Sequence, residues 1–343
     1  MIPPDHHRGL RRREFMRLAL AGSAAVTLAA CAPNPLITAD QSPKPQPTLD
    51  DARRQTAQSA ADLAALATAC AGLEDADEAF AAWCTALAAQ HQAHLSVLCQ
   101  ADPLGGVLAD PTPIEQITAA TPAVPAAQAE AMQVLAQRHA ELAELTSSVA
   151  ATQSGGSDAD QTAGMALLWI SQWLCAQVAA TAFGSGDAAA FSPAPVQGEA
   201  VPARTEMGDA AQARQVVLSH QRALVFGLQA LYGRADYTQP IDGQLAARLS
   251  EAMRERDATA AAITAGGATP EPQPPEYAMP GDVTDPSQTA QIWGALELAV
   301  MNAWARLAAV DAAGRADASQ QALTQAGRAR DLGTALPFWP GWV

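Results

Sequence analysis

The sequence predicts an all-α protein, and three features of its composition lead to this fold class. Of its 343 residues, 49% are hydrophobic but only 5% are aromatic. Alanine, the strongest helix former, makes up about a quarter of the chain. Tyrosine occurs 3 times and phenylalanine 6 times, so residue types that favour β-strands are scarce. These features exclude an all-β fold and disfavour an α/β fold.

Apolar spacing and helix-breaking residues divide the chain into eight predicted helices. The first predicted helix ends at Gly72, and the second stops at Asp102-Pro103. Asp285 followed by Pro286 indicates a helix start, because aspartate caps helix N-termini and proline fits the first helical position. The predicted helices span residues 51–71, 77–100, 125–152, 158–183, 207–232, 242–265, 285–313 and 317–332.

The predicted helices form two halves with the same plan, a helical hairpin, a long Pro-rich connection and a second hairpin. A connection of roughly 20 residues, extended at roughly 3 Å per residue, can cross a bundle and start the third helix parallel to the second. This topology is typical of ferritin-like four-helix bundles, so we expect two in tandem. The alternative is one irregular helical array in which the halves interpenetrate. The predicted organisation is a signal peptide (1–31), a tether (32–50), an N-terminal bundle (51–183), a linker (184–204) and a C-terminal bundle with an aromatic tail (205–343).

The N-terminus is predicted to be a targeting signal rather than part of the fold. Arg12, Arg13 and Phe15 belong to a basic segment, which a short apolar run and Cys31 follow. Such a run is too short for a stable transmembrane helix and is typical of a secretory signal. The arginine pair with Phe15 resembles the twin-arginine signal, and residues 28–31 (Leu-Ala-Ala-Cys) resemble the lipobox read by lipoprotein signal peptidase.

This resemblance implies export in a folded state, cleavage before Cys31 and acylation of the Cys31 thiol. Because several acyl chains anchor a protein stably, the predicted location is the extracytoplasmic face of the cell membrane. The expected partners are the lipid bilayer and an envelope protein. Residues 32–50 contain five prolines and are predicted to be an extended tether. The alternatives are an ordinary signal peptide with a chance cysteine and a coincidental run of arginines.

The formal net charge of −15 disfavours one class of partner. An acidic body repels phosphate backbones and anionic membrane surfaces at long range, so nucleic acid is not a predicted partner. Membrane attachment therefore depends on the acyl chains rather than on surface charge.

Four cysteines remain after the signal: Cys70, Cys84, Cys99 and Cys175. An even number outside the cytoplasm suggests disulfides. Cys84 and Cys99 lie on one predicted helix roughly 22 Å apart, too far to bond. Of the two remaining pairings we favour Cys70 with Cys84 and Cys99 with Cys175. The alternative is four buried free thiols.

Several segments of the second half resemble a known family. The match covers about residues 212–341, and residues 51–183 resemble the N-terminal partner region of the same lipoproteins through Gln90-His91-Gln92-Ala93-His94-Leu95. The segments that carry the resemblance in the second half are Pro272-Gln273-Pro274-Pro275-Glu276-Tyr277-Ala278-Met279-Pro280, Val283-Thr284-Asp285-Pro286, Leu296-Glu297-Leu298-Ala299 and Phe338-Trp339-Pro340-Gly341. They resemble the ferritin-like domain of unknown function found in exported proteins of high-G+C Gram-positive bacteria. The resemblance implies a fold and a cellular location rather than an activity.

A ferritin-like di-iron site is not predicted. Such a site needs a glutamate on each of two helices and Glu-x-x-His on each of the other two. The sequence contains no Glu-x-x-His, and Ser219 precedes His220 where the resemblance would place an acidic residue. The fourth helix offers Trp169, Gln172 and Trp173 instead of carboxylates.

Three histidines are nevertheless candidate metal ligands. His91 and His94 are three residues apart on one predicted helix, and His139 lies on the next helix of the same bundle. Three imidazoles can bind zinc or copper if a fourth ligand is available. The alternative is a structural role, either on a polar helix face or in a core where each ring is hydrogen-bonded. The sequence therefore predicts no cofactor and leaves these residues as metal candidates.

A buried polar cluster is predicted in the second half. His220 and Arg256 fall on the apolar stripes of their helices, and buried polar side chains require partners. Glu297 on the next helix is the expected partner. In the alternative arrangement, Arg256 extends to solvent and Glu297 lies at the helix edge.

The tail and the remaining motifs complete the functional prediction. Residues 336–343 are unusually aromatic and are expected to fold back over a bundle end, with a docking peptide as the alternative.

The sequence contains no nucleophile elbow, P-loop or dinucleotide-binding turn. The predicted function is non-catalytic binding or scaffolding in the cell envelope. A metal-binding protein or degenerate ferritin-like oxidase is the first alternative, and an apolar-ligand carrier is the second.

Overall fold

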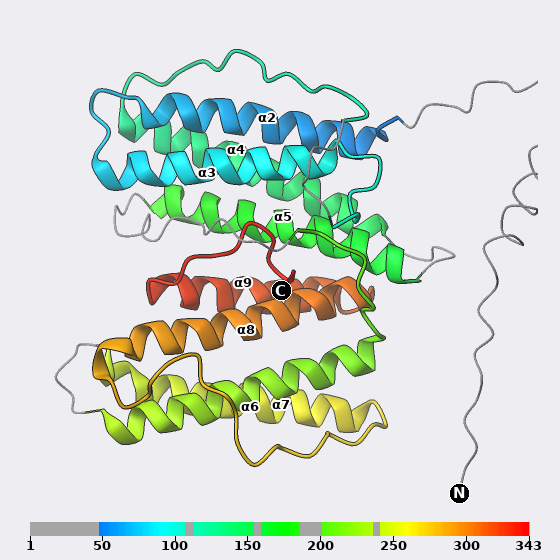
Figure 1. The fold of residues 1–343 in the computed structure, drawn as a ribbon, viewed down its shortest axis with the longest axis vertical. Helices are drawn as coiled ribbons and strands as arrows, with labels where there is room; N and C mark the ends of the chain where they lie inside the picture. The colour runs from blue at the N-terminus through cyan, green and yellow to red at the C-terminus, as the bar shows by residue number, and fades with distance from the viewer. Residues whose placement is uncertain (1–47, 107–112, 154–158, 186–200, 236–240, 343) are drawn as a thin grey trace, which may run out of the picture. The chain divides into compact units, whose positions relative to one another are not determined.

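The computed structural model describes residues 48–106, 113–153, 159–185, 201–235 and 241–342. Over these ranges the chain is all-α, with eight α-helices and no strand beyond one isolated bridge between Gly105 and Ala203 (Figure 1), so the predicted fold class is confirmed. The signal residues Arg12, Arg13 and Phe15, the lipidation residue Cys31 and most of the predicted linker lie outside the described residues. The helices are α2 (Asp51–Ala71), α3 (Glu78–Leu98), α4 (Gln128–Thr152), α5 (Ala159–Ser185), α6 (Ala210–Arg234), α7 (Asp242–Ala265), α8 (Thr289–Val310) and α9 (Arg315–Asp331), and a 3-10 turn, η3 (Pro286–Gln288), precedes α8.

Local signals in the sequence account for many of the helix ends. The Asp50 carboxylate accepts a hydrogen bond from the backbone N–H of Arg53, and Asp77 accepts one from Phe80, so both residues cap helix N-termini. Asp285 caps the 3-10 turn at Pro286 in the same way. These caps satisfy backbone donors that have no partner within the helix.

In the first half, α2 packs against both α3 and α4, and α4 packs against α5. Figure 1 shows the connection to α4 running along α2. Three contacts hold it there: the Arg54 side chain with Glu115 at 3.0 Å, Gln58 with the Thr118 carbonyl at 3.1 Å, and the Ala120 N–H with Asp62 at 2.8 Å.

The helices of the second half pack against one another in the same pattern. Helix α6 packs against α7 and α8, and α8 packs against α9. The connection after α7 lies along α6, because Gln215 and Arg222 donate hydrogen bonds to the carbonyls of Thr269 and Glu271 at 2.9 and 2.6 Å. The contacts fit the predicted hairpin–connection–hairpin plan, and the assignment of each half to a ferritin-like bundle stays a prediction.

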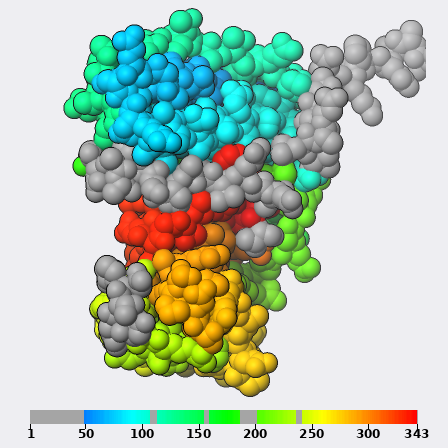
Figure 2. Space-filling model, turned by 60° about the vertical axis from the view of Figure 1, so that its left-hand side comes forward, coloured from blue at the N-terminus to red at the C-terminus, as the bar shows by residue number. Residues whose placement is uncertain are grey.

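The largest group of core residues includes side chains from both halves. Trp169 of α5, Met301 of α8 and the tail residues Phe338 and Trp339 are buried in one cluster. Helix α5 packs against α8 and α9 as well as against α4. Figure 2 shows α9 and the tail, in red, between the blue and cyan helices of the first half and the orange and yellow helices of the second. The two halves therefore share a core.

Helix α5 is a strongly apolar helix of this core. It is the one helix in the described ranges whose length and composition would allow a membrane crossing, and 78% of its most apolar window is buried inside the protein. The core helix of a soluble protein has the same composition.

Neither predicted disulfide is present in the structure. Cys70, Cys84, Cys99 and Cys175 are all buried free thiols in the structure. Cys175 contacts Gln90 at 3.2 Å, whereas Cys99 lies nine residues further along α3, about 14 Å away at 1.5 Å per residue. That separation exceeds the Cα distance of about 7 Å that a disulfide tolerates. Burial also raises the pKa of the Cys70 thiol to about 11 and that of Cys84 to about 12, so both pack as protonated, apolar side chains.

Candidate functional site

The structure brings the three candidate metal-binding histidines together in the first half. His91 and His94 face inward from α3, His139 faces them from α4, and none is more than 1% exposed. The Nε2 atoms of His91 and His139 are 3.0 Å apart. The ring of His94 lies 5.9 Å from that of His91, and its Nε2 is 2.8 Å from the carbonyl oxygen of Phe338 in the tail.

The hydrogen-bond partners determine where the protons of these rings lie. The Nδ1 of His139 is 2.7 Å from the carbonyl oxygen of Leu135, and a carbonyl only accepts, so this Nδ1 carries a proton. The Nε2 of a neutral His139 then accepts a hydrogen bond from the Nε2–H of His91. His94 likewise donates from Nε2 to Phe338. The Nδ1 atoms of His91 and His94 are left as buried acceptors with no hydrogen-bond partner.

Burial holds all three imidazoles neutral. It lowers the pKa of His94 and of His139 to about 4. The pKa of His91 lies well below its usual value, first because of burial and then because of the neighbouring His139 and His94. The described residues contain no group of three or more His, Cys, Asp or Glu side chains arranged to hold a metal ion. The observed arrangement is a chain of hydrogen bonds.

The tail covers this histidine site. The ring of Trp339 lies 4.4 Å from the ring of His94. The thiol of Cys175 is 3.7 Å from the carbonyl oxygen of Phe338, and burial raises the pKa of this thiol to about 12, so it is not nucleophilic at neutral pH. On the other side, the tail bonds to the second half, where the Gly341 N–H donates to Asn302 at 2.7 Å. The tail folds back as expected, but it lies between the two halves rather than over a bundle end.

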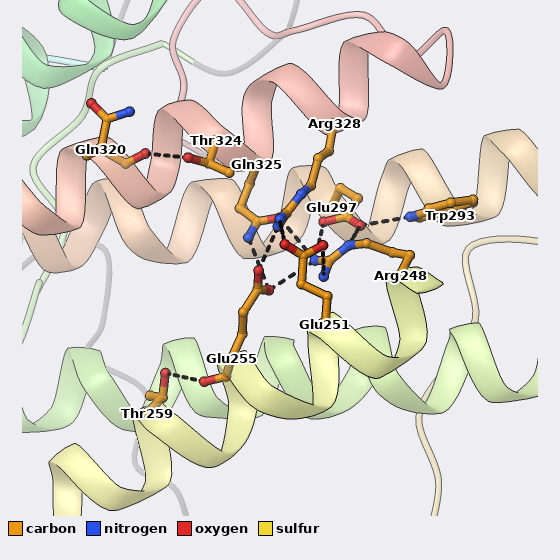
Figure 3. A network of polar contacts seen from close by, with 10 residues as sticks. All are labelled: Arg248, Glu251, Glu255, Thr259, Trp293, Glu297, Gln320, Thr324, Gln325 and Arg328. Carbon is orange, nitrogen blue, oxygen red and sulfur yellow. Dashed lines mark hydrogen bonds and ion pairs between the residues drawn. The ribbon is translucent and has the colours of Figure 1, made fainter. Parts of the chain in front are cut away.

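A second polar site lies in the interior of the second half (Figure 3). Glu297 of α8 is completely buried and accepts hydrogen bonds from Arg248 Nε and Trp293 Nε1, both at 2.7 Å. Arg248 also reaches Glu255 at 3.1 Å, and Glu255 in turn pairs with Arg328 of α9 at 2.8 Å. Burial lowers the pKa of Arg248, but its contacts with Glu297 and Glu255 raise it by more, so the guanidinium stays charged.

The predicted cluster of His220, Arg256 and Glu297 is therefore corrected at two of its three positions. Arg256 pairs with its neighbour Asp257 at 2.7 Å and does not reach Glu297. His220 is half-buried, and burial and then the charge of Arg306 lower its pKa. The residue that meets Glu297 is Arg248.

The error about Arg256 came from the choice of the buried face of α7. The sequence offers two apolar stripes on this helix, and the one through Leu249 and Met253 points to Arg256. In the structure Met253 is 37% exposed, and the buried face passes through Leu245, Arg248 and Ala252. At about 100° per residue, Leu245, Ala252 and Ile263 share one face, and Arg256 lies nearer its centre than Arg248, so the spacing alone does not identify Arg248.

Helices α2 and α4 and the connection above them enclose a groove, here called the α2–α4 groove. Its volume is about 550 Å³. Leu63 and Leu66 of α2, Val134 and Leu142 of α4 and residues 120–125 of the connection line it. This volume lies in the range of small-molecule sites, about 300–1,000 Å³. The sequence could not reveal this groove, because it depends on how the connection lies across two helices.

The protein is all-α over the described residues. It contains two buried polar networks, one of histidines and one around Glu297, and the open α2–α4 groove. Residues 213–343 are similar to a protein family described as "Domain of unknown function (DUF4439)". This match covers most of α6 and the remainder of the second half. No curated protein and no solved structure matches the chain.

Proposed function

We propose that this chain is a lipoprotein, anchored through acylated Cys31 on the extracytoplasmic face of the cell membrane, that binds a ligand or partner without catalysis. The twin-arginine and lipobox-like residues support the location. The acidic charge of the chain, −15, supports attachment by acyl chains rather than by basic surface residues.

The observation that carries the binding function is the α2–α4 groove. It combines an apolar floor, including Leu63 and Leu142, with charged residues at its edge, including Asp62 and Arg138. Binding sites for small molecules have this composition, since apolar contacts supply affinity and a few polar groups orient the ligand.

A non-catalytic role is supported by how the ionisable groups of the interior are used. The three neutral histidines donate to protein acceptors, and Glu297 accepts from Arg248 and Trp293. General acid–base catalysis requires a group that can reach a substrate proton, and these groups face each other instead.

The anchoring is tested by replacing the acylated residue. Cys31→Ser should abolish incorporation of radioactive palmitate and release the protein from the membrane fraction. Cys70→Ser, which removes a buried thiol of the body, should retain both the label and the membrane location. Replacing Arg12 and Arg13 together with lysine should block export. Label that persists in Cys31→Ser would contradict the proposal.

The binding function is tested on protein purified from its native membrane. Mass spectrometry of its organic extract should detect a bound small molecule. Val134→Trp, which fills the groove, should lose that molecule, whereas Val216→Trp, at a valine of α6 that is 43% exposed, should keep it. Equal retention by both variants would contradict binding in the groove.

A metal-binding protein is the second candidate, because His91 Nε2 and His139 Nε2 are only 3.0 Å apart. Two nitrogens that share a tetrahedral zinc ion at about 2.0–2.1 Å are separated by about 3.3 Å. Stoichiometric metal by elemental mass spectrometry, lost when His91, His94 and His139 are replaced, would favour this candidate. The degenerate-oxidase version has less support, because guanidinium groups of Arg248 and Arg328 lie among the carboxylates of the second half.

A further inference from the structure

We propose that the α2–α4 groove binds a small molecule that joins an apolar chain or ring to a cationic group. This inference rests on the proposed binding function and specifies the class of ligand. It follows from three properties of the groove: its apolar floor, its fixed walls and the charge at its edge.

The floor of the groove favours an apolar body. Leu63 and Leu66 of α2 and Leu142 of α4 form it, and Val134 lines one side. At the rim, the side chain of Val124 is 54% exposed. The leucines are already buried, so an apolar molecule in the groove would mainly remove the surface of Val124 from water, which contributes roughly 25 cal/mol per Å² buried.

The walls of the groove are held in place by hydrogen bonds. Asp62 Oδ1 accepts from the Ala120 N–H at 2.8 Å and from Gln58 at 2.9 Å, and Glu130 Oε2 accepts from the Ala126 N–H at 2.9 Å. These contacts tie the connection to α2 and to the start of α4. A ligand therefore enters a preformed groove and does not have to order the connection when it binds.

The same two carboxylates supply the charge that selects a cation. Each uses one oxygen to hold the connection, and the other oxygen, Asp62 Oδ2 or Glu130 Oε1, has no hydrogen-bond partner among the described residues. The remaining charged residues of the groove, Arg138 and Glu141, form an ion pair at 3.1 Å and offset each other.

The groove thus carries a net charge of −2 from Asp62 and Glu130, next to apolar surface and within an acidic protein. A protonated amine can donate to the free oxygen of one carboxylate while its apolar part lies on the leucines, and the charge of the other carboxylate adds to the attraction. The same field repels an anionic ligand.

The proposal is tested with three probes that share one chain length: octylammonium, octanol and octanoate. Isothermal titration calorimetry of the full chain at pH 7, with each probe below its micelle concentration, should show one octylammonium site. Octylammonium should bind about 10-fold more tightly than octanol, the ratio expected of one good ion pair, and octanoate should bind more weakly than octanol.

A matched pair of substitutions on α4 tests the role of charge. Glu130→Gln keeps an oxygen for the Ala126 N–H but removes the charge, so it should weaken octylammonium binding several-fold and leave octanol binding unchanged. Glu144→Gln, the same substitution at an exposed position of α4 outside the groove lining, should change neither. Equal effects of the two substitutions would overturn the proposal.

The probes also separate this proposal from the broader binding function. Equal or tighter binding of octanol or octanoate would overturn the cationic class and leave groove binding intact. If none of the probes binds, both the ligand class and the binding role assigned to the groove fail. Val134→Trp should abolish binding of the probes and Val216→Trp should preserve it.

A photoreactive octylammonium analogue should label residues of the groove in the unmodified chain. Labelling elsewhere would contradict the proposal without relying on any variant.

Discussion

Glu297 and Arg248 show how the interior of the second half accommodates charge. Moving an ion from water into a protein costs several kcal/mol unless hydrogen bonds and an opposite charge replace its hydration. Glu297 receives three such bonds, two from Arg248 at 2.7 and 3.1 Å and one from Trp293 at 2.7 Å. The pair is therefore stable only when both partners are present.

We expect Arg248→Leu to lower the free energy of unfolding by about 3–5 kcal/mol, because it leaves Glu297 buried without its counter-ion. Arg256→Leu on the same helix should change it by less than about 1 kcal/mol, since Arg256 pairs with Asp257, which is 67% exposed. Urea unfolding measures both values. Similar losses in the two variants would contradict the placement of Arg248 at Glu297.

The buried histidines make stability depend on pH. His94 and His139 have pKa values of about 4 in the folded protein, below the usual value of 6.5. Between these values the unfolded chain binds protons that the folded chain does not. The free energy of unfolding should therefore fall as the pH drops from about 6.5 towards 4, by up to about 1.4 kcal/mol per pH unit for each titrating histidine.

Melting temperatures at pH 7.5, 6, 5.5 and 5 check this expectation. His139→Gln should reduce the slope between pH 6.5 and 5. His220→Gln should reduce it less, because His220 is only half-buried and its lowered pKa depends partly on Arg306. A melting temperature that is constant across this range would contradict neutral, buried histidines.

At the scale of elements, the C-terminal tail acts as a bridge. Phe338 and Trp339 contact His94 of the first half, and Gly341 bonds to Asn302 and Arg306 of the second. Gly341 has a φ of +87°, a conformation that glycine adopts without strain. A side chain at this position would also meet Leu167 at 2.6 Å. The chain can therefore turn here only with glycine.

Trp339→Ala should destabilise the protein by about 3–5 kcal/mol, the range for truncation of a buried large aromatic side chain. Trp339 is 2% exposed, whereas Tyr232 is 40% exposed, so Tyr232→Ala should have a much smaller effect. Thermal unfolding compares the two variants. A loss for Trp339→Ala no larger than that for Tyr232→Ala would show that the tail does not hold the halves together.

At the scale of the whole molecule, the two halves are joined by more than a linker. Helix α5 packs against α8 and α9, and Arg315 at the start of α9 donates to the carbonyl of Gln153 at the end of α4 at 3.0 Å. A guanidinium at a helix C-terminus stabilises the carbonyls that lack partners within the helix. These contacts and the shared core couple the stability of one half to that of the other.

We therefore expect a single cooperative unfolding transition for residues of both halves. Differential scanning calorimetry should give one peak whose calorimetric and van't Hoff enthalpies agree. Two separated peaks, or unfolding of α2–α5 at a temperature at which α6–α9 remain folded in hydrogen exchange, would contradict this expectation. The result also tests whether the halves act as separate domains.

Local patterns in the sequence are enough to predict the helices and their order. Excess alanine, aspartate caps such as Asp50 and Asp285, and the Pro-rich connections act within a few residues, so they can be recognised without a fold. The same local patterns placed His91, His94 and His139 in one half, where the structure brings them into contact.

Long-range packing, by contrast, controls which polar groups meet, where the tail lies and how the groove forms. Arg248 rather than Arg256 faces Glu297, because α7 packs against α6 with the side chains of Arg248 and Glu255 directed at Glu297 of α8 and Arg328 of α9. Cys175 of α5 contacts Gln90 of α3, nine residues before Cys99, so the predicted Cys99–Cys175 disulfide is absent from the structure. Each of these outcomes depends on contacts between residues distant in the chain, and the periodicity of a single helix carries no information about which neighbour will cover it.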